Sequence, residues 1–147
     1  MSLKEQLTDD MKEAMKAKEK DRLAVIRMVR GAIKQQEIDG KIELDDEAVI
    51  SVISKEVKMR RDSIEEFQKG GREDLVSQTE AEIAFLMPYL PQQLSADEVR
   101  ELVQAAVAQT GASSPKDMGK VMGALMPKVK GRADGKLVNT LVKEALN

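Results

Sequence analysis

The chain has 147 residues, of which 41% are hydrophobic and 34% are charged, and its 24 Lys+Arg against 26 Asp+Glu give a net charge of −2. It contains no Cys and no His, which excludes disulfides, Cys/His zinc sites, Cys nucleophiles and imidazole acid–base chemistry. Aromatic residues make up only 2%, too few for the stacking platforms that bind single-stranded nucleic acid. No apolar run of signal-peptide or membrane length follows the charged amino terminus, so we expect a cytoplasmic protein with no membrane partner.

Helical signals fill the first part of the chain. Apolar residues at every fourth position predict a helix over residues 2–17. A second helix, apolar around much of its circumference, is expected to run to about residue 38, with Asp21 as its N-cap and Gly40 as a left-handed end. These two helices are predicted to contribute much of the first core.

Two further helices are expected before the first proline. Asp45 has the position of an N-cap for a helix that extends to about residue 69. Gly70 and Gly71 then form a strong stop signal. A fourth helix is predicted over residues 72–87, so the first part of the chain holds about four helices.

Two prolines interrupt the helical pattern at residues 87–94. Because Pro88 and Pro91 cannot continue a helix, we expect a stiff, extended connector there. The connector predicts a boundary between a helical amino-terminal domain, residues 1–92, and a smaller carboxy-terminal domain, residues 93–147.

Three shorter helices are predicted in the second part. Ser95 and Glu98 form a capping box for the first, Ser114 is the expected N-cap of the second, which ends before Pro127, and the third begins near Asp134. Three methionines spaced four apart on the middle helix are interpreted as core residues, with a binding groove as the alternative. The predicted fold is therefore all-α, with four helices and then three.

Positive charge gathers toward the carboxyl terminus. From Gly111 onward, seven Lys and Arg residues accompany three acidic ones, a local charge of +4, which leaves −6 for the rest of the chain. A basic module on an acidic helical body is typical of proteins that meet a polyanion, because Lys and Arg supply most of the sequence-independent affinity for phosphates. A solvated surface without a ligand is the alternative interpretation.

The densest cationic cluster precedes the last predicted helix. Backbone N–H groups at a helix start, next to Lys and Arg, form an anion site, and glycine permits close approach of a ligand. The alternative is that Gly131 and Gly135 only satisfy turn geometry, and the spacing of a Walker loop is absent. The residues expected to contact the polyanion are Lys120, Lys128, Lys130, Gly131, Arg132, Gly135 and Lys136.

Two other charged clusters receive structural interpretations. Arg27, Arg30 and Lys34 form a basic line along the second predicted helix, and we expect acidic residues of a neighbouring helix to pair with them. The mixed charges of residues 58–66 are expected to form ion pairs on a solvated surface.

Several motifs resemble those of a known family. They are Arg72–Leu75, Tyr89–Ser95, and Asp117–Gly123 running into Met126–Gly135. Across the whole chain these residues are similar to the YqeY-like proteins of the GatB/YqeY family. The last motif shares a reduced pattern with the tail of the GatB subunit of glutamine-dependent tRNA amidotransferases.

The resemblance implies an all-α fold and a relation to the GatB tail that contacts tRNA. It also implies a relation to a carbon–nitrogen ligase that uses glutamine as amido donor. In that enzyme, ATP-dependent activation belongs to a separate GatB domain and glutamine hydrolysis to another subunit. The resemblance therefore does not imply independent catalysis by this chain.

We therefore predict an accessory protein that binds tRNA or another structured RNA and uses no cofactor or metal. One alternative is a helical interaction module for a protein partner, with no role in nucleic-acid binding. The other is an amide-transfer enzyme, for which only a Ser–Lys arrangement of Ser113 or Ser114 with Lys116 is available. The sequence does not determine the oligomeric state.

Overall fold

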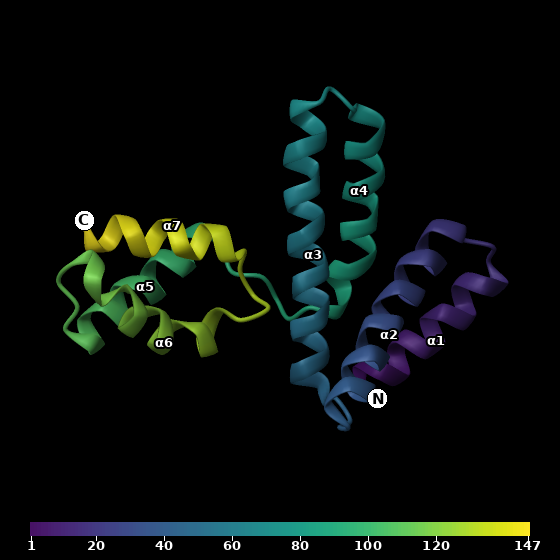
Figure 1. Cartoon of the computed structure of the whole chain (residues 1–147), viewed down its shortest axis with the longest axis horizontal. Coiled ribbons are helices and arrows are strands. Elements are labelled where there is room, and N and C mark those ends of the chain that lie inside the picture. The colour runs from purple at the N-terminus through teal and green to yellow at the C-terminus, as the bar shows by residue number, and fades with distance from the viewer. The chain divides into compact units, whose positions relative to one another are not determined.

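The computed structural model describes all 147 residues, and its backbone is helical with no β-strand (Figure 1). The all-α prediction is confirmed, with seven α-helices and two short 3-10 helices. Close contacts divide the chain into unit 1, Met1–Leu90, and unit 2, Pro91–Asn147, near the boundary expected from the sequence. That each unit folds alone stays a prediction. None of the helices has both the length and the apolar composition needed to cross a bilayer.

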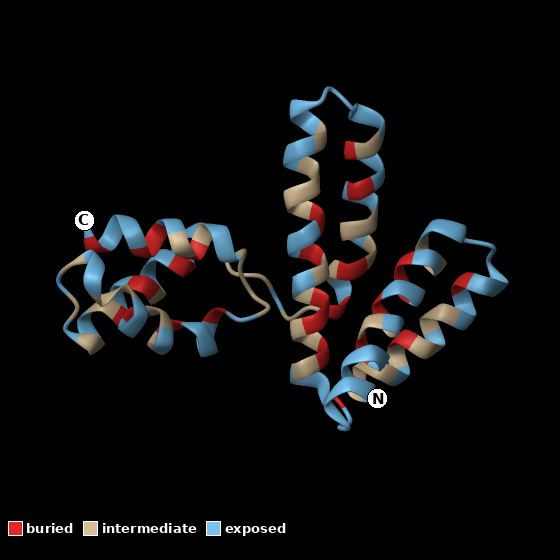
Figure 2. Ribbon diagram, viewed as in Figure 1, coloured by how far each residue is buried: buried red, intermediate tan, exposed pale blue.

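Unit 1 consists of two antiparallel helical hairpins (Figure 1). Its elements in chain order are α1 (Leu3–Lys16), α2 (Lys20–Gly40), α3 (Asp46–Lys69), α4 (Glu73–Leu86) and the 3-10 helix η1 (Met87–Tyr89). One hairpin contains α1 and α2, and the other contains α3 and α4. They pack through a single apolar cluster that faces inward in Figure 2, whose fully covered members include Leu7, Ile26, Val49, Ile53 and Leu86.

The second hairpin begins and turns as the sequence predicts. The Asp45 carboxylate accepts the Ala48 N–H at 2.9 Å and so caps α3. Gly71 has a φ of +71°, a left-handed conformation that glycine adopts without strain, and it lies in the turn between α3 and α4. Local sequence signals are therefore sufficient to define this hairpin.

The end of α2 differs from the prediction. The left-handed residue is Lys41, with a φ of +51°, and not Gly40, which is still helical. Glu37 provides the physical reason. Its backbone carbonyl accepts the Ile42 N–H at 3.1 Å, and its carboxylate accepts the Leu44 N–H at 2.8 Å, so contacts beyond the helix determine where it stops.

Two other predictions for unit 1 are wrong. Asp21 is not the N-cap of α2, because the helix begins at Lys20 and Asp21 lies in its first turn, where the helix dipole favours a negative charge. The first part of the connector is not extended, since Met87–Tyr89 form the 3-10 helix η1. Tyr89 is buried and its hydroxyl donates to Asp10, which holds this segment against the core.

Unit 2 is a bundle of three longer helices with one short helical turn. Its elements are α5 (Ala96–Thr110), the 3-10 helix η2 (Pro115–Asp117), α6 (Met118–Val129) and α7 (Gly135–Leu146). The predicted capping box of Ser95 and Glu98 begins α5. The three helices enclose an apolar cluster whose most covered members are Val99, Val103, Val121, Leu125, Val138 and Val142.

Two local predictions for unit 2 are wrong. Ser114 makes no side-chain capping bond, and Asp117 instead accepts the Ser113 N–H at 3.0 Å. The helix α6 does not stop before Pro127 but continues to Val129. Because Val129 is only 2% exposed, its burial offsets the one hydrogen bond that the proline cannot donate.

The methionines of α6 also divide between two environments. Met118 and Met122 are partly buried and pack against the core of unit 2, as interpreted from their spacing. Met126 is 42% exposed and lies outside it. The core interpretation is therefore correct for two of the three residues.

Candidate nucleic-acid interface

The predicted cationic cluster lies on the turn between α6 and α7. Lys128 belongs to the last turn of α6, Lys130 is its C-cap, and Asp134 is the N-cap of α7. Between them, Gly131 has a φ of +74°, which strains any residue with a side chain. The backbone conformation therefore favours glycine at this position even without a ligand.

Three hydrogen bonds, which we call the clasp, hold this turn against the segment before α5. Gln93 Nε2 donates to the Gly131 carbonyl at 2.8 Å, and the Leu94 N–H donates to the Arg132 carbonyl at 2.7 Å. Arg132 Nε donates to the Gln92 carbonyl at 3.3 Å. The clasp thus fixes the turn through residues distant in sequence.

The lysines of the turn point their charges into solvent. The side chains of Lys128 and Lys130 are exposed and make no ion pair or hydrogen bond within the chain, and Lys136 is exposed in the first turn of α7. Arg132 is half-buried, and its guanidinium is engaged in the clasp. Lys128 and Lys130 are therefore the cations most available to a ligand.

The amino end of α7 already carries a carboxylate. Asp134 Oδ1 accepts the Lys136 N–H at 3.2 Å, so one backbone donor expected for a ligand is used inside the protein. Gly135 begins the helix with no positive φ, and a Cβ placed there would meet nothing within 4 Å. Neither strain nor packing requires a glycine at this second position.

Lys120 does not join the other predicted residues. It lies in the first turn of α6, eight residues and about 12 Å along the helix axis from Lys128. Its Nζ is 3.9 Å from Asp117 Oδ1. The structure therefore brings six of the seven predicted residues to one turn and leaves Lys120 at the opposite end of α6.

The alternative Ser–Lys site is not assembled. Neither the Ser113 nor the Ser114 hydroxyl forms a hydrogen bond with Lys116. The Ser113 backbone N–H instead donates to Asp117, and this hydrogen bond lowers the pKa of the Asp117 carboxyl. These residues organise the start of α6 and do not form a nucleophile–base pair.

The basic line on α2 does not form the ion pairs with a neighbouring helix that the sequence predicts. Arg27 and Lys34 are exposed and pair with no carboxylate. Arg30 Nη1 donates to Met11 Sδ at 2.9 Å, a weak acceptor, and to no acidic group. The prediction of structural ion pairs is therefore wrong here. Gly31, beside these cations, was given no role from the sequence, although a glycine inside a helical pattern is a signal.

Comparison with known proteins identifies the family. A family model described as Yqey-like protein matches residues 4–146, nearly the whole chain. The chain belongs to the YqeY-like family. This confirms the resemblance inferred from the sequence motifs. The match includes both units and the turn between α6 and α7.

Curated relatives of this YqeY-like chain occur in fungi. A protein of Pyrenophora tritici-repentis is 34% identical over 143 residues, 95% of this chain and 78% of the relative. One of Lachancea thermotolerans is 46% identical over 88 residues, 58% of this chain and 46% of the relative. One of Saccharomyces cerevisiae strain YJM789 is 30% identical over 148 residues, 94% of this chain and 80% of the relative.

These names correct the expected location. All three relatives are called altered inheritance of mitochondria protein 41, mitochondrial, which contradicts the prediction of a cytoplasmic protein. The prediction depended on the lack of an amino-terminal apolar run. Such a run is the mark of secretory and membrane segments only, so its absence does not separate the cytoplasm from an organelle.

Proposed function

We propose that this YqeY-like protein binds tRNA or another structured RNA through the turn between α6 and α7, as an accessory protein without catalysis of its own. One observation carries the proposal. Lys128 and Lys130 are exposed and unpaired on a turn that the clasp holds in a defined conformation. A preformed turn presents cations to phosphates without first having to be ordered.

The composition of unit 2 favours contact with the RNA backbone over contact with bases. The three aromatic residues of the chain, Phe67, Phe85 and Tyr89, all precede unit 2, so no ring is available there for base stacking. Contacts from lysines to phosphates position a nucleic acid without reading its sequence. The motif similarity to the GatB tail also supports tRNA as the ligand.

The test measures tRNA affinity of the full chain over a range of salt concentrations. The variant Lys128→Ala/Lys130→Ala is compared with a matched control, Lys116→Ala/Lys143→Ala, which removes the same charge from two other exposed lysines of unit 2. We expect weaker binding by the first variant, and a salt slope flatter by about 0.7–0.9 for each phosphate that the variant no longer neutralises. The control should retain the slope of the parent.

Gly135→Ala probes close approach at the same site. Since Gly131 has a positive φ, any replacement there perturbs the backbone and cannot isolate a ligand contact. Gly135→Ala adds a methyl group in open space, so we expect an unchanged melting temperature and weaker tRNA binding.

Two outcomes would reject the proposal. The first is equal affinity and salt slope for the Lys128/Lys130 variant and the parent protein. The second is absence of tRNA binding by the parent at low salt. Binding of a protein partner that is insensitive to salt would favour the alternative, an interaction module with an apolar docking surface.

A further inference from the structure

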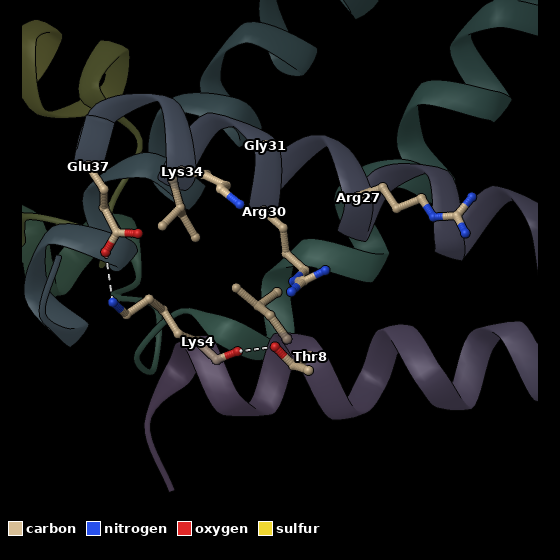
Figure 3. Close-up of a pocket in the computed structure, with 9 residues that line it drawn as sticks. Lys4, Thr8, Arg27, Arg30, Gly31, Lys34 and Glu37 are labelled. Carbon is tan, nitrogen blue, oxygen red and sulfur yellow. Dashed lines mark hydrogen bonds and ion pairs between the residues drawn. The ribbon is translucent and has the colours of Figure 1, made fainter. Parts of the chain in front are cut away.

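A second group of cations lines a groove between α1 and α2 in unit 1 (Figure 3). The groove has a volume of about 510 Å³. Its floor includes the apolar side chains of Leu7 and Ile33, and its rim is polar. The polar lining residues are Lys4, Thr8, Arg27, Arg30, Lys34 and Glu37.

Three of the four cations form no ion pair, although the charge of Lys34 is near enough to lower the pKa of Glu37. The guanidinium of Arg30 extends from α2 toward α1 in Figure 3, and Met11 Sδ is its acceptor. Arg27 and Lys34 make no ion pair. Lys4 differs, because its Nζ lies 2.7 Å from Glu37 Oε2 and their charges cancel. The groove therefore carries an uncompensated charge of about three.

The Lys4–Glu37 pair has a structural role that the other cations lack. Glu37 also accepts the Leu44 N–H at 2.8 Å and so links α1, α2 and the turn before α3. The hydrogen bond from Lys4 lowers the pKa of Glu37, and the same bond raises the pKa of Lys4, so both stay charged. Arg27 and Lys34 contribute no comparable link, which leaves them available to a ligand.

Gly31 is a second, independent observation at this groove. It is exposed in the interior of α2, where glycine is less favourable than alanine. It has no positive φ, and a Cβ placed on it would meet nothing within 4 Å. Neither the backbone nor packing explains this glycine. Gly31 leaves the helix backbone uncovered between Arg27 and Lys34.

We propose that this groove binds consecutive phosphates of a single RNA strand. Arg27 and Lys34 are seven residues apart, which is about 10.5 Å along the helix axis. A single strand presents its phosphates one after another, so a line of cations of this length can contact more than one of them. An open line of charge suits a strand better than an isolated phosphate. RNA as the ligand rests on the proposed function, whereas the groove is a separate surface in the other unit.

Amide signals of the isotopically labelled full chain provide the test. A short single-stranded oligoribonucleotide is added, and we expect the signals of Gly31 and Thr8 to shift. In Arg27→Ala/Lys34→Ala these shifts should disappear, and the salt slope of binding should flatten by about 1.4. The matched control Lys55→Ala/Lys58→Ala, which removes two exposed lysines of α3, should retain them.

Gly31→Ala separates a ligand contact from a structural role. Alanine is the better helix former, so the melting temperature should rise, while RNA binding should weaken because the added methyl group occupies the line of approach. A rise in melting temperature with unchanged RNA affinity would overturn the role of this glycine in close approach.

The variant Lys128→Ala/Lys130→Ala distinguishes this inference from the proposed function. If RNA shifts signals of the α6–α7 turn but never those of Gly31 and Thr8, the groove is not an RNA site and the proposed function stands. If Gly31 responds while the Lys128/Lys130 variant binds tRNA like the parent, the groove stands and the proposed function fails. No response anywhere overturns both. Equal shifts with inorganic phosphate, at matched phosphate concentration, would overturn the assignment to a strand.

Discussion

The cations of unit 1 differ in whether they are buried in ion pairs or exposed without one. Arg60 of α3 is 7% exposed, with Nη1 2.8 Å from Glu56 Oε2 and Nε 3.0 Å from Glu82 Oε1. Arg27 and Lys34 of α2 are exposed and form no ion pair. Arg60 thus joins α3 to α4, whereas the two cations of α2 remain available to a ligand.

The spacing of cations along a helix therefore does not show whether they form ion pairs. Residues 58–66 were predicted to form ion pairs on a solvated surface, yet Arg60 is buried and bonds across to α4 through Glu82. The α2 cations were predicted to be paired and are not. Both errors have one cause, because helical periodicity gives the face of a residue but not the neighbour that the face meets.

The largest expected effect tests this difference directly. Arg60→Ala leaves Glu56 and Glu82 uncompensated and should lower the free energy of unfolding by about 2–3 kcal/mol, at the lower end for buried pairs because Glu82 is partly exposed. Arg27→Ala should change it by less than about 0.5 kcal/mol. Urea unfolding followed by circular dichroism measures both, and equal effects would break the comparison.

A second structural network joins α1 to the segment that follows α4. The hydroxyl of Tyr89 donates to Asp10, which lies 3.9 Å from the Arg22 guanidinium. Tyr89→Phe removes a hydrogen bond to a charged group and should lower the free energy of unfolding by about 1.5 kcal/mol. Urea unfolding measures this decrease, with Lys34→Ala as a control that removes a cation without an ion pair. We expect a decrease between those of Arg60→Ala and Arg27→Ala. A decrease as small as that of Lys34→Ala would contradict the prediction.

The pH dependence of this network has a defined sign. Burial, and then the hydrogen bond to Asp10, raise the pKa of Tyr89 well above its ordinary value. The folded state therefore favours the neutral phenol, and its contribution to stability is complete below about pH 10 and decreases above that pH. Tyr89 is the only Tyr and the chain has no Trp, so absorbance of the phenolate reports it alone. Ionisation near pH 10 in the folded chain would refute the prediction.

The smallest effects concern two glycines beside cations. Gly31→Ala should raise the free energy of unfolding by about 0.5–1 kcal/mol, because alanine favours the helix and no neighbour obstructs it. Gly131→Ala should lower it by about 1 kcal/mol, because φ is +74° there. Melting temperatures of the two variants should move in opposite directions, and a common direction would show that backbone geometry does not distinguish these sites.

The sequence predicts those features of the fold that depend on neighbouring residues. The caps at Asp45 and Ser95 and the stop before Gly71 are satisfied within one turn of the chain, and they occur as expected. The end of α2 and the passage of α6 through Pro127 depend on distant contacts. Local rules do not contain that information.

The candidate site also has one part that the sequence predicts and one that depends on distant contacts. A run of cations around Gly131 identifies the α6–α7 turn from the sequence alone. The clasp was not predictable, because it joins Gln92, Gln93 and Leu94 to residues about forty positions later. The groove of unit 1 was not predictable either, because its two walls come from different helices. Its cations come from α2, but the opposite wall, with Lys4 and Thr8, comes from α1.

The clasp has an entropic consequence for the turn between α6 and α7. Ordering a backbone residue costs about 1–2 kcal/mol, and a loose surface turn would incur this cost when its ligand binds. Here the carbonyls of Gly131 and Arg132 are already fixed when the chain folds. Under the proposed function, Gln93 and Leu94 carry no charge and need not touch the RNA, yet they would increase its affinity by fixing the residues that contact it.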